Sequence, residues 1–311
     1  MINIFKTGPD DIVHAIDKIE KGCWINLIDP DSDEIDLVSK NTGLDRDFLK
    51  AALDKEESSR FEVESGQMLV LLDVPIMDII NTTSFYSTIP LGIILNDDYI
   101  VTIVLKENNI IGDFYEQKIK TFYTYKKSRF ILQILLRIDK YYLSFLKQID
   151  KANKNIEKRL HKSLKNQDLS DIMELEKSLV HFSISLKANQ ITLERMAKLE
   201  IMHKYPEDED LLEDVIIENR QAIEMTNIYR NILTSIINTM QLIISNNQNI
   251  LIKRLISLIG ILSIPVIIGI FFGMNVPIPW GNFSFAFISI ICITIIIFIM
   301  VLIIILKWKK D

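Results

Sequence analysis

Hydrophobic residues are concentrated near the C-terminal end of the chain, in two uncharged segments. Leu255–Phe272 contains eighteen residues without a charge, and Phe283–Leu306 contains twenty-four. A bilayer core about 30 Å thick is crossed by roughly 20 apolar residues in a helix. Both segments therefore predict membrane-spanning helices. The stretch between them is uncharged and rich in Gly, Pro and Asn, which predicts a connecting loop.

A long helix is predicted just before the first apolar segment. From Glu207 to Ile259 there is neither proline nor glycine, and the pattern continues into that segment without a break. Apolar residues recur there at spacings near three and four, as in a coiled-coil seam. We expect this seam to pack against other copies of the chain. Its members are Ala222, Met225, Tyr229, Ile232, Ile236, Ile243 and Ile250.

The first part of the chain mixes strand and helix signals. The turn-type tripeptide Asn96-Asp97-Asp98 predicts a hairpin between two strands, and Asp10–Glu20 and Asp45–Leu53 are predicted as helices. A compact α/β domain follows from this mixture. The predicted strands are Cys23–Ile28, Met68–Val74, Thr88–Leu95 and Tyr99–Leu105.

Strand signals stop near Lys126. Ser128–Lys165 and Asp168–Lys204 are two long helical patterns, separated by Asn166 and Gln167. Asp168 or Ser170 is available as the N-cap of the second helix. An antiparallel helical hairpin is expected.

Charged residues indicate the topology. Residues 250–311 contain five basic residues, all at the outer ends of the apolar segments, and one acidic residue, Asp311. By the positive-inside rule, both chain ends face the cytoplasm and the loop faces outward. Removing these residues from the totals of 35 and 41 leaves 30 basic and 40 acidic residues in the first 249, which does not suit nucleic-acid binding. The basic residues are Lys253, Arg254, Lys307, Lys309 and Lys310.

The residues of common catalytic and cofactor sites are scattered. Cys23 and Cys292 are far apart, the four histidines are dispersed, and the glycines form neither GxGxxG nor GxxxxGK. No nucleophile and base are grouped. We therefore expect no enzyme, no bound nucleotide and no resident cofactor.

The stretch Gly273-Met274-Asn275 lies at the outer end of the first apolar segment. In this setting it resembles the signature of the CorA family of magnesium and cobalt transporters, and the resemblance covers essentially the whole chain. Further matching residues are Trp24-Ile25, Asp29-Pro30, Glu34, Leu53-Asp54, Arg60-Phe61-Glu62, Pro90-Leu91-Gly92, Val101-Thr102, Asn249, Lys253, Leu255, Pro265 and Gly269.

The resemblance implies an α-rich fold with an α/β cytoplasmic domain, a long-helix stalk and two C-terminal transmembrane helices. It implies a homopentamer in the cytoplasmic membrane that conducts Mg²⁺ inward, with Co²⁺ as a second substrate and Mg²⁺ also as the regulatory ligand. The expected segments are an α/β domain at 1–125, a helical hairpin at 126–205, the stalk and first span at 206–272, an external loop at 273–282, the second span at 283–306 and a basic tail at 307–311.

Gly273, Met274 and Asn275 are the implied selectivity filter. Mg²⁺ prefers octahedral oxygen coordination and gives up water reluctantly, so neutral oxygens can hold the ion together with its water shell. Asn275 offers an amide oxygen, and Gly273 allows backbone carbonyls to approach an axis closely. The alternative is that Gly and Asn simply cap the first helix. No acidic residue follows the motif here, unlike one common family pattern, so an entry mechanism based on a ring of acids is in doubt.

The register from Gly273 back along the helix implies further pore-lining residues. Asn249 corresponds to a pore-facing polar residue of the family, and Asn238 and Ser263 are further polar candidates. Ile252 and Leu255 would form an apolar constriction that gates by dewetting. The alternative for all five is ordinary packing or hydrogen bonding between helices.

An acidic run opens the long helix. Asp214, and with it Asp210, lies where the resemblance implies an intersubunit magnesium-sensing site. The nearest acids of the α/β domain that could complete it are Asp54, Glu56 and Glu57. The alternative is electrostatic, because acids stabilise a helix N-terminus by about 0.3–1 kcal/mol each.

Two rival functions stay open. Within transport, the cation could be Co²⁺, Ni²⁺ or Zn²⁺, or the direction could be export; GMN rather than GIN favours magnesium. From another class, the protein could be a membrane-tethered coiled-coil scaffold, although a scaffold has no use for Asn275 in an apolar surround.

Overall fold

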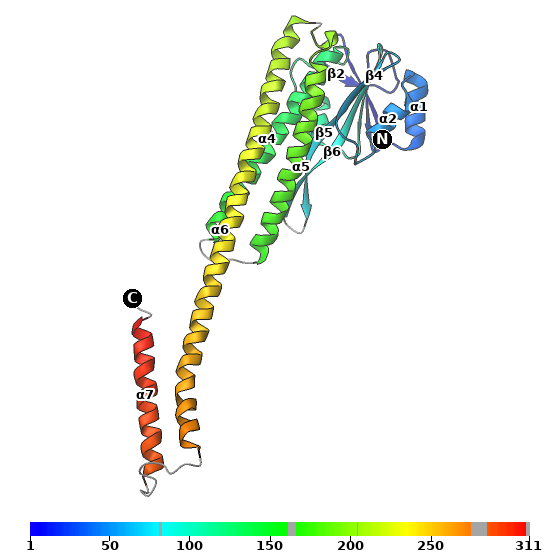
Figure 1. Cartoon of the computed structure of the whole chain (residues 1–311). Coiled ribbons are helices and arrows are strands. Elements are labelled where there is room, and N and C mark those ends of the chain that lie inside the picture. Colours follow the sequence, from blue (N-terminus) through cyan, green and yellow to red (C-terminus); the bar gives the residue numbers. More distant parts are fainter. Residues whose placement is uncertain (81–82, 161–165, 204, 275–284, 309–311) are drawn as a thin grey trace. The chain divides into compact units, whose positions relative to one another are not determined.

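The computed structural model describes residues 1–80, 83–160, 166–203, 205–274 and 285–308 (Figure 1). The chain divides into two compact units, Met1–Ile237 and Asn238–Asp311, which are described separately. The first unit contains the sheet and all helices up to α5, together with the N-terminal part of α6. The second contains the rest of α6 and α7.

A seven-stranded sheet forms the centre of the first unit, in the order β2-β1-β3-β7-β6-β5-β4. Neighbouring strands pair antiparallel except β3 and β7, which are parallel. The four predicted strands are confirmed, as β3, β5, β6 and β7. The strands are β1 Ile2–Thr7, β2 Val13–Ala15, β3 Trp24–Ile28, β4 Arg60–Glu64, β5 Gln67–Ile80, β6 Thr83–Leu95 and β7 Ile100–Val104.

The predicted hairpin between β6 and β7 is also confirmed. Leu95 pairs with Ile100, and the side-chain oxygen of Asn96 accepts hydrogen bonds from the backbone N–H groups of Asp98 (3.0 Å) and Tyr99 (2.9 Å). Asn96 thus closes the turn by imitating a backbone acceptor, as asparagine does in many turns.

The predicted helix at Asp10–Glu20 is wrong, because this segment forms a turn and the short strand β2. The N–H of Gly8 donates to the carbonyl of Ile12 at 2.8 Å, and Asp11 has a φ of 58°. The Asp10 carboxylate accepts hydrogen bonds from the N–H of Ile12 and from the His14 ring. Side chain and backbone together favour the turn over a helix.

Helices cover both faces of the sheet (Figure 1). Helices α1 (Ser32–Thr42) and α2 (Arg46–Ala51) lie on one face, and α4 (Lys127–Leu160) and α5 (Asn166–Met196) lie on the other. A short helix, α3 (Asn109–Tyr115), follows β7. The unit therefore has three layers, an arrangement that buries both faces of the sheet.

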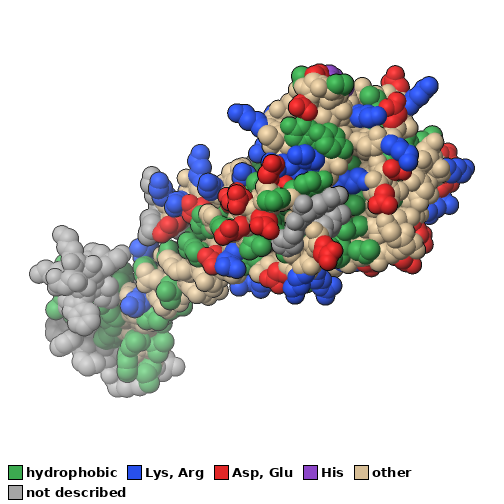
Figure 2. Space-filling view, turned by 90° about the horizontal axis from the view of Figure 1, so that it is seen from above, with side chains coloured by type: hydrophobic (Ala, Val, Ile, Leu, Met, Phe, Trp, Pro, Cys, Tyr) green, Lys and Arg blue, Asp and Glu red, His purple; other side chains and the backbone are tan. Residues whose placement is uncertain are grey.

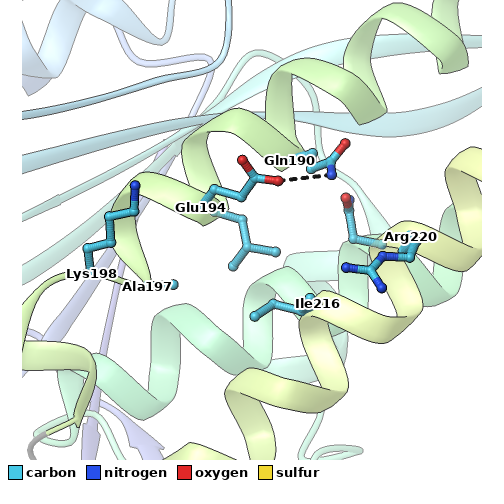
Figure 3. Close-up of a pocket in the computed structure, with 8 residues that line it drawn as sticks. Gln190, Glu194, Ala197, Lys198, Ile216 and Arg220 are labelled. Atoms are coloured by element: carbon cyan, nitrogen blue, oxygen red, sulfur yellow. Dashed lines mark hydrogen bonds between the residues drawn. The ribbon is translucent and has the colours of Figure 1, made fainter.

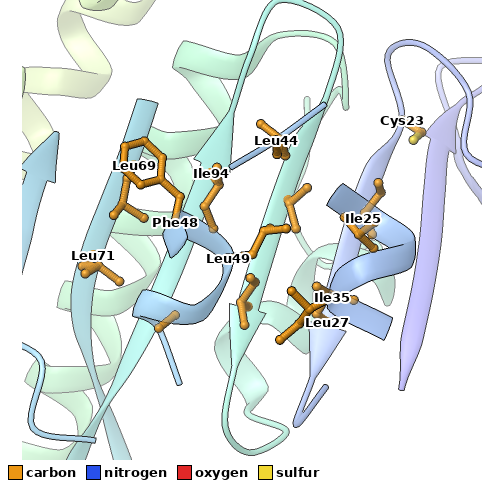
Figure 4. Close-up of a cluster of buried hydrophobic side chains, with 14 residues drawn as sticks. Cys23, Ile25, Leu27, Ile35, Leu44, Phe48, Leu49, Leu69, Leu71 and Ile94 are labelled. Carbon is orange, nitrogen blue, oxygen red and sulfur yellow. The ribbon is translucent and has the colours of Figure 1, made fainter. Parts of the chain in front are cut away.

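The core under α1 and α2 illustrates the alternation of strand side chains (Figure 4). Ile25 and Leu27 of β3 point toward Ile35 of α1, and Leu69 and Leu71 of β5 point the same way. Residues two apart on a strand share a face. The residues between them face the α4 and α5 layer.

Trp24 anchors that second layer. Its ring packs edge-on against Phe114, Phe122 and Phe130, with centroids 5.1–6.3 Å away. Its indole N–H donates to Thr102 Oγ1 at 2.8 Å, so the buried polar atom is satisfied.

The two long helices α4 and α5 form the predicted antiparallel hairpin. The Arg159 guanidinium binds the Asp168 carboxylate at 2.7 Å near the turn, and the rings of Tyr142 and Phe182 meet 4.9 Å apart further along. Two details are corrected. Asp168 and Ser170 are not N-caps, since α5 begins at Asn166, and α5 ends at Met196, before the 3₁₀ turn η1 (Glu200–His203).

Helix α6 (Pro206–Phe272) is a single helix of 67 residues, and α7 is Ala286–Trp308. The predicted continuity of α6 through Ile259 into the apolar segment is confirmed. On the face of the molecule seen in Figure 2, acidic and basic side chains are interspersed over the α/β part. The two-layered helical cover, the sheet and the long helix together confirm the predicted fold class.

Gly92 permits the close approach of α2 to β6. A Cβ atom at this position would lie 2.6 Å from the Cβ of Ala52, and Gly92 has no left-handed φ. We expect Gly92→Ala to destabilise the purified protein by about 1–3 kcal/mol, because the added carbon overpacks the contact. Thermal unfolding in detergent measures this. Ala52→Gly should restore most of the lost stability when it is combined with Gly92→Ala. If Gly92→Ala destabilised the protein equally with Ala and with Gly at position 52, the Cβ of Ala52 would not be the cause.

Candidate functional site

Helix α6 begins with a buried anchor. Pro206 opens the helix, and Glu207, Asp208 and Glu209 occupy its first turn, where acids favour a helix N-terminus. Asp208 is buried, with only 1 % of its surface exposed, whereas most acidic side chains lie at the protein surface. Its carboxylate accepts hydrogen bonds from Arg129 Nη1 (3.1 Å) and Ser128 Oγ (3.2 Å). These bonds fix the start of α6 to the start of α4.

A second polar contact joins the same helices. Asn219 Nδ2 donates to Asp139 Oδ1 at 2.9 Å, and both side chains are buried. This contact lies 11 residues beyond the pair Ser128–Asp208 in each helix, or about three turns. Helices α4 and α6 therefore run parallel in a constant register over this stretch. The other α6 side chains buried within the first unit are Leu212, Val215, Ala222, Thr226, Leu233 and Ile236.

The predicted coiled-coil seam is divided by this packing. Ala222 and Ile236 are buried within the chain itself, whereas Ile232 is 39 % exposed. The seam is therefore not one free face, and part of its periodicity reflects contact of α6 with its own domain. Packing of the rest against other copies stays a prediction.

The C-terminal stretch of α6 is apolar and uncovered. The helix contains a stretch long and apolar enough to cross a membrane, and none of that stretch is buried within the chain. The apolar part described for α7, Ile288–Ile303, is shorter. Large exposed apolar surface requires lipid or other protein around it.

Four of the predicted pore residues form one stripe on α6. At about 100° per residue, Asn238, Asn249, Ile252 and Ser263 fall within about 60° of one another around the helix axis. Leu255 lies outside the stripe, and Ile256 takes the corresponding place on it. Asn238, Asn249 and Ile252 are exposed, and Ser263 is partly exposed.

Ser263 is compatible with an apolar surround. Its hydroxyl donates to the carbonyl of Ile259 at 2.8 Å, which satisfies its donor within the helix. The oxygen lone pairs remain free to accept, so Ser263 presents an acceptor to whatever lies along the stripe.

Helix α6 ends just before the GMN motif. The N–H of Gly273 still donates to the carbonyl of Gly269 at 2.9 Å, and Gly273 does not take the left-handed conformation of a C-cap glycine. Met274 is 54 % exposed. Asn275 and the rest of the predicted loop through residue 282 lie outside the described residues, so the filter stays a prediction.

The five acids predicted for a regulatory metal site lie in two places. Asp54 and Glu57 are held locally: Asp54 accepts from the N–H of Glu56 at 2.9 Å, and Glu57 pairs with Arg60 at 3.0 Å. Asp210 and Asp214 lie one turn apart on α6, exposed and without side-chain partners in the described part of the chain. Within these residues of one chain, no three metal-ligating side chains gather. A site shared between subunits stays a prediction.

Sequence reasoning missed a cavity of about 340 Å³ between α5 and α6. Figure 3 shows Gln190 and Glu194 of α5 on one side and Ile216 and Arg220 of α6 on the other. Asn219 also lines it. Its polar residues are separated in sequence and carry no motif, so only the packing of the two helices brings them together.

A model of the family described as CorA-like Mg²⁺ transporter protein matches residues 20–309. The chain belongs to this family. It is therefore a divalent cation transporter of the CorA family and a membrane protein. The predicted resemblance is confirmed.

Individual CorA relatives agree with the family match. The chain is 26 % identical over 262 residues to the cobalt/magnesium transport protein CorA of Methanocaldococcus jannaschii, covering 81 % of this chain and 79 % of that protein. The complete structure of the CorA magnesium transporter from the same organism superposes with a TM-score of 0.82 at 22 % identity, covering 98 % of this chain and 96 % of that one.

More distant structures share the fold alone. The full-length CmaX protein gives a TM-score of 0.70 at 12 % identity, with 96 % of each chain covered. The ZntB cytoplasmic domain from Vibrio parahaemolyticus gives 0.61 at 11 % identity, covering 79 % of this chain and 97 % of that domain.

The anchor of α6 can be tested by removing its cation. We expect Arg129→Ala to destabilise the protein by about 3 kcal/mol, because it leaves the buried Asp208 carboxylate without its charged partner. Thermal unfolding of the detergent-purified protein measures the loss. Lys177→Ala is the control, since it breaks an exposed pair with Glu174 that is worth less than about 1 kcal/mol. Similar losses in both variants would show that the buried pair does not anchor α6.

Proposed function

We propose that this CorA-family transporter is a homopentameric channel that admits Mg²⁺ to the cytoplasm, with Co²⁺ as a second substrate. The observation that carries the proposal is the polar stripe of Asn238, Asn249 and Ser263 on an otherwise apolar part of α6. The name of the M. jannaschii relative, a cobalt/magnesium transport protein, supports the choice of cations.

The stripe has a physical rationale only in an assembly. In one chain Asn249 would face lipid or solvent on the same helix as uncovered Ile and Leu side chains. If several copies of α6 surround an axis, the amide and hydroxyl oxygens line it while the remaining apolar faces contact lipid or neighbouring helices. Ile252, and Leu255 or Ile256, would then narrow the path near its cytoplasmic end.

Asn275 is the proposed filter residue. Hydrated Mg²⁺ presents water hydrogens outward, and a ring of amide oxygens can accept them without removing the water. Gly273 keeps the preceding turn free of a side chain, which leaves room for such a ring. The uncharged stretch that follows means that attraction at the mouth comes from amide and carbonyl dipoles.

The proposed topology has two spans, α6 and α7, with both ends of the chain in the cytoplasm. The basic residues at the outer ends of the apolar segments support this orientation. A membrane potential that is negative inside then drives Mg²⁺ inward, contributing about 2.3 kcal/mol per charge per 100 mV.

Internal Mg²⁺ is the proposed regulator. Asp210 and Asp214 lie one turn apart on α6, exposed and without side-chain partners among the described residues, so they can approach and repel acids of a neighbouring copy. Mg²⁺ bound between the subunits would cancel the repulsion between these acids and favour the closed state. Its loss would release the acids and favour opening, a population shift caused by differential binding.

Uptake of metal into liposomes containing the purified protein tests the function. We expect Mg²⁺ to enter, and Asn275→Ala to abolish uptake while the protein still assembles. Zn²⁺ uptake or outward transport in place of Mg²⁺ entry would favour the zinc or export alternatives. No flux of any divalent cation would favour a scaffold.

The stripe predicts a difference between two neighbouring asparagines. Asn249→Leu should lower Mg²⁺ uptake by about tenfold, equivalent to about 1.4 kcal/mol, since it replaces a polar contact along the path by an apolar one. Asn247→Leu is the matched control, because Asn247 lies about 160° away around the helix. If the two substitutions changed Mg²⁺ uptake into liposomes equally, the stripe would not line the ion path.

Regulation is tested at Asp214. Asp214→Ala should conduct at internal Mg²⁺ concentrations that close the wild-type channel, because the closed state loses a ligand oxygen. Glu213→Ala, on the adjacent exposed position, should keep wild-type inhibition. Inward current measured against internal Mg²⁺ decides; superimposable curves for the wild type and Asp214→Ala would mean that Asp214 only stabilises the helix N-terminus.

A further inference from the structure

Asp139 of α4 and Asn219 of α6 form one hydrogen bond, and a second bond between them would need a proton. Asp139 is 2 % exposed and Asn219 is 3 % exposed. Asn219 Nδ2 donates to one carboxylate oxygen, Asp139 Oδ1, at 2.9 Å. The other two oxygens of the pair, Asp139 Oδ2 and Asn219 Oδ1, are buried and have no hydrogen-bond partner among the described residues.

Both unpartnered atoms are acceptors, so a single proton can satisfy them together. A neutral carboxylic acid and a carboxamide each present one donor and one acceptor side by side, and they can pair through two hydrogen bonds in a ring. An ionised carboxylate has no proton to donate, so within this pair it makes only the one bond already present. It would leave the second oxygen of each group buried without a donor, which costs free energy.

We propose that Asp139 binds a proton and donates it to Asn219 Oδ1, so that a carboxyl–carboxamide pair joins α4 to α6 and is lost when the proton leaves. This proton-binding site goes beyond the proposed cation channel and does not depend on it. It places a proton-sensitive contact on the same helix that carries the polar stripe.

The surroundings favour a bound proton near neutral pH. Burial raises the pKa of the Asp139 carboxyl to about 8; the hydrogen bond from Asn219 opposes this shift, and the Glu218 carboxylate adds to it. No cation forms an ion pair with Asp139 among the described residues. Further titratable or charged groups near the pair or lining the adjoining cavity are Tyr142 of α4, Glu194 of α5, Lys198 just after α5, and Arg220 of α6.

The cavity between α5 and α6 lies beside the pair. Asn219 lines this space of about 340 Å³, together with Gln190 and Glu194, which are hydrogen-bonded to each other at 3.0 Å (Figure 3). Polar lining and volume allow water to approach the amide. A proton can therefore exchange with solvent although both side chains are buried.

A second buried aspartate on the same interface has a cation as its partner, unlike Asp139. Asp208, eleven residues earlier on α6, is equally buried but binds Arg129 and Ser128. The interface of α4 and α6 thus contains one contact held by a fixed cation and one that requires a proton.

Infrared spectroscopy of the full-length protein in detergent tests the proposal directly. The wild type at pH 6 should show the C=O stretching band of a buried protonated carboxyl, which disappears on titration with a midpoint near the Asp139 pKa of about 8. The band should be missing in Asp139→Asn and retained in Asp208→Asn, the matched control. Asn219→Ala should move the band to higher frequency, because the carboxyl loses its partner. A spectrum unchanged by Asp139→Asn, or a band unmoved by Asn219→Ala, would overturn the proposal.

Thermal unfolding gives an independent readout. Asparagine at 139 can form the same two-bond ring with Asn219 at any pH, whereas the wild type needs a proton. The Asp139 carboxyl has a higher pKa in the folded protein, about 8, than in the unfolded chain, about 3.9. Its contribution to stability is therefore complete below about pH 3.9 and is lost progressively as the pH rises toward about 8. The melting temperature of the wild type should therefore fall relative to Asp139→Asn between about pH 4 and 8 and then run parallel. Parallel curves across this whole range would overturn the proposal.

Discussion

The register between α4 and α6 is the constraint on which the rest of the first unit depends. Two buried polar contacts, Ser128–Asp208 and Asp139–Asn219, are spaced by eleven residues on both helices, and Arg129 adds its charge to the first of them. Sliding one helix by a single residue would break both contacts and leave buried charge and amide groups unpaired, which is far more costly than a shift between apolar surfaces. Apolar packing alone would tolerate neighbouring registers, so the polar pairs select one.

This constraint matters because α6 has two chemically different parts. Its first part supplies Leu212, Val215 and Ala222 to the interior of the α/β unit, and its last part is apolar but uncovered. Both parts belong to one continuous helix of a CorA-family divalent cation transporter. In the proposed channel, this helix carries both the ion path and the contacts with α4 that a proton would change.

Secondary structure was predicted well where the local sequence alone favours one conformation. The strands β3, β5, β6 and β7 follow β-branched runs, and the turn at Asn96 carries its own hydrogen-bond acceptor. Helix α1 had no prediction, although Asp31 and Glu34 form a capping box at its start. The segment after Asp10 was assigned to a helix because its composition permits one; the pairing of β2 with β1, which joins Phe5 to Ala15, prevails over that local preference.

The sequence by itself determined the continuity of α6, the α/β character of the first unit and the family, and it predicted two membrane-spanning segments, because charge-free length, the absence of helix breakers and a motif in its setting are properties of contiguous residues. The stripe of Asn238, Asn249, Ile252 and Ser263 could also be placed from the sequence, since a long helix has one fixed angular step. Only the tertiary structure decided that Ala222 and Ile236 are buried within the chain's own domain, and that Asp139 meets Asn219. These contacts join residues about 80 positions apart, and their partners are chosen by packing register and burial, which no local pattern encodes.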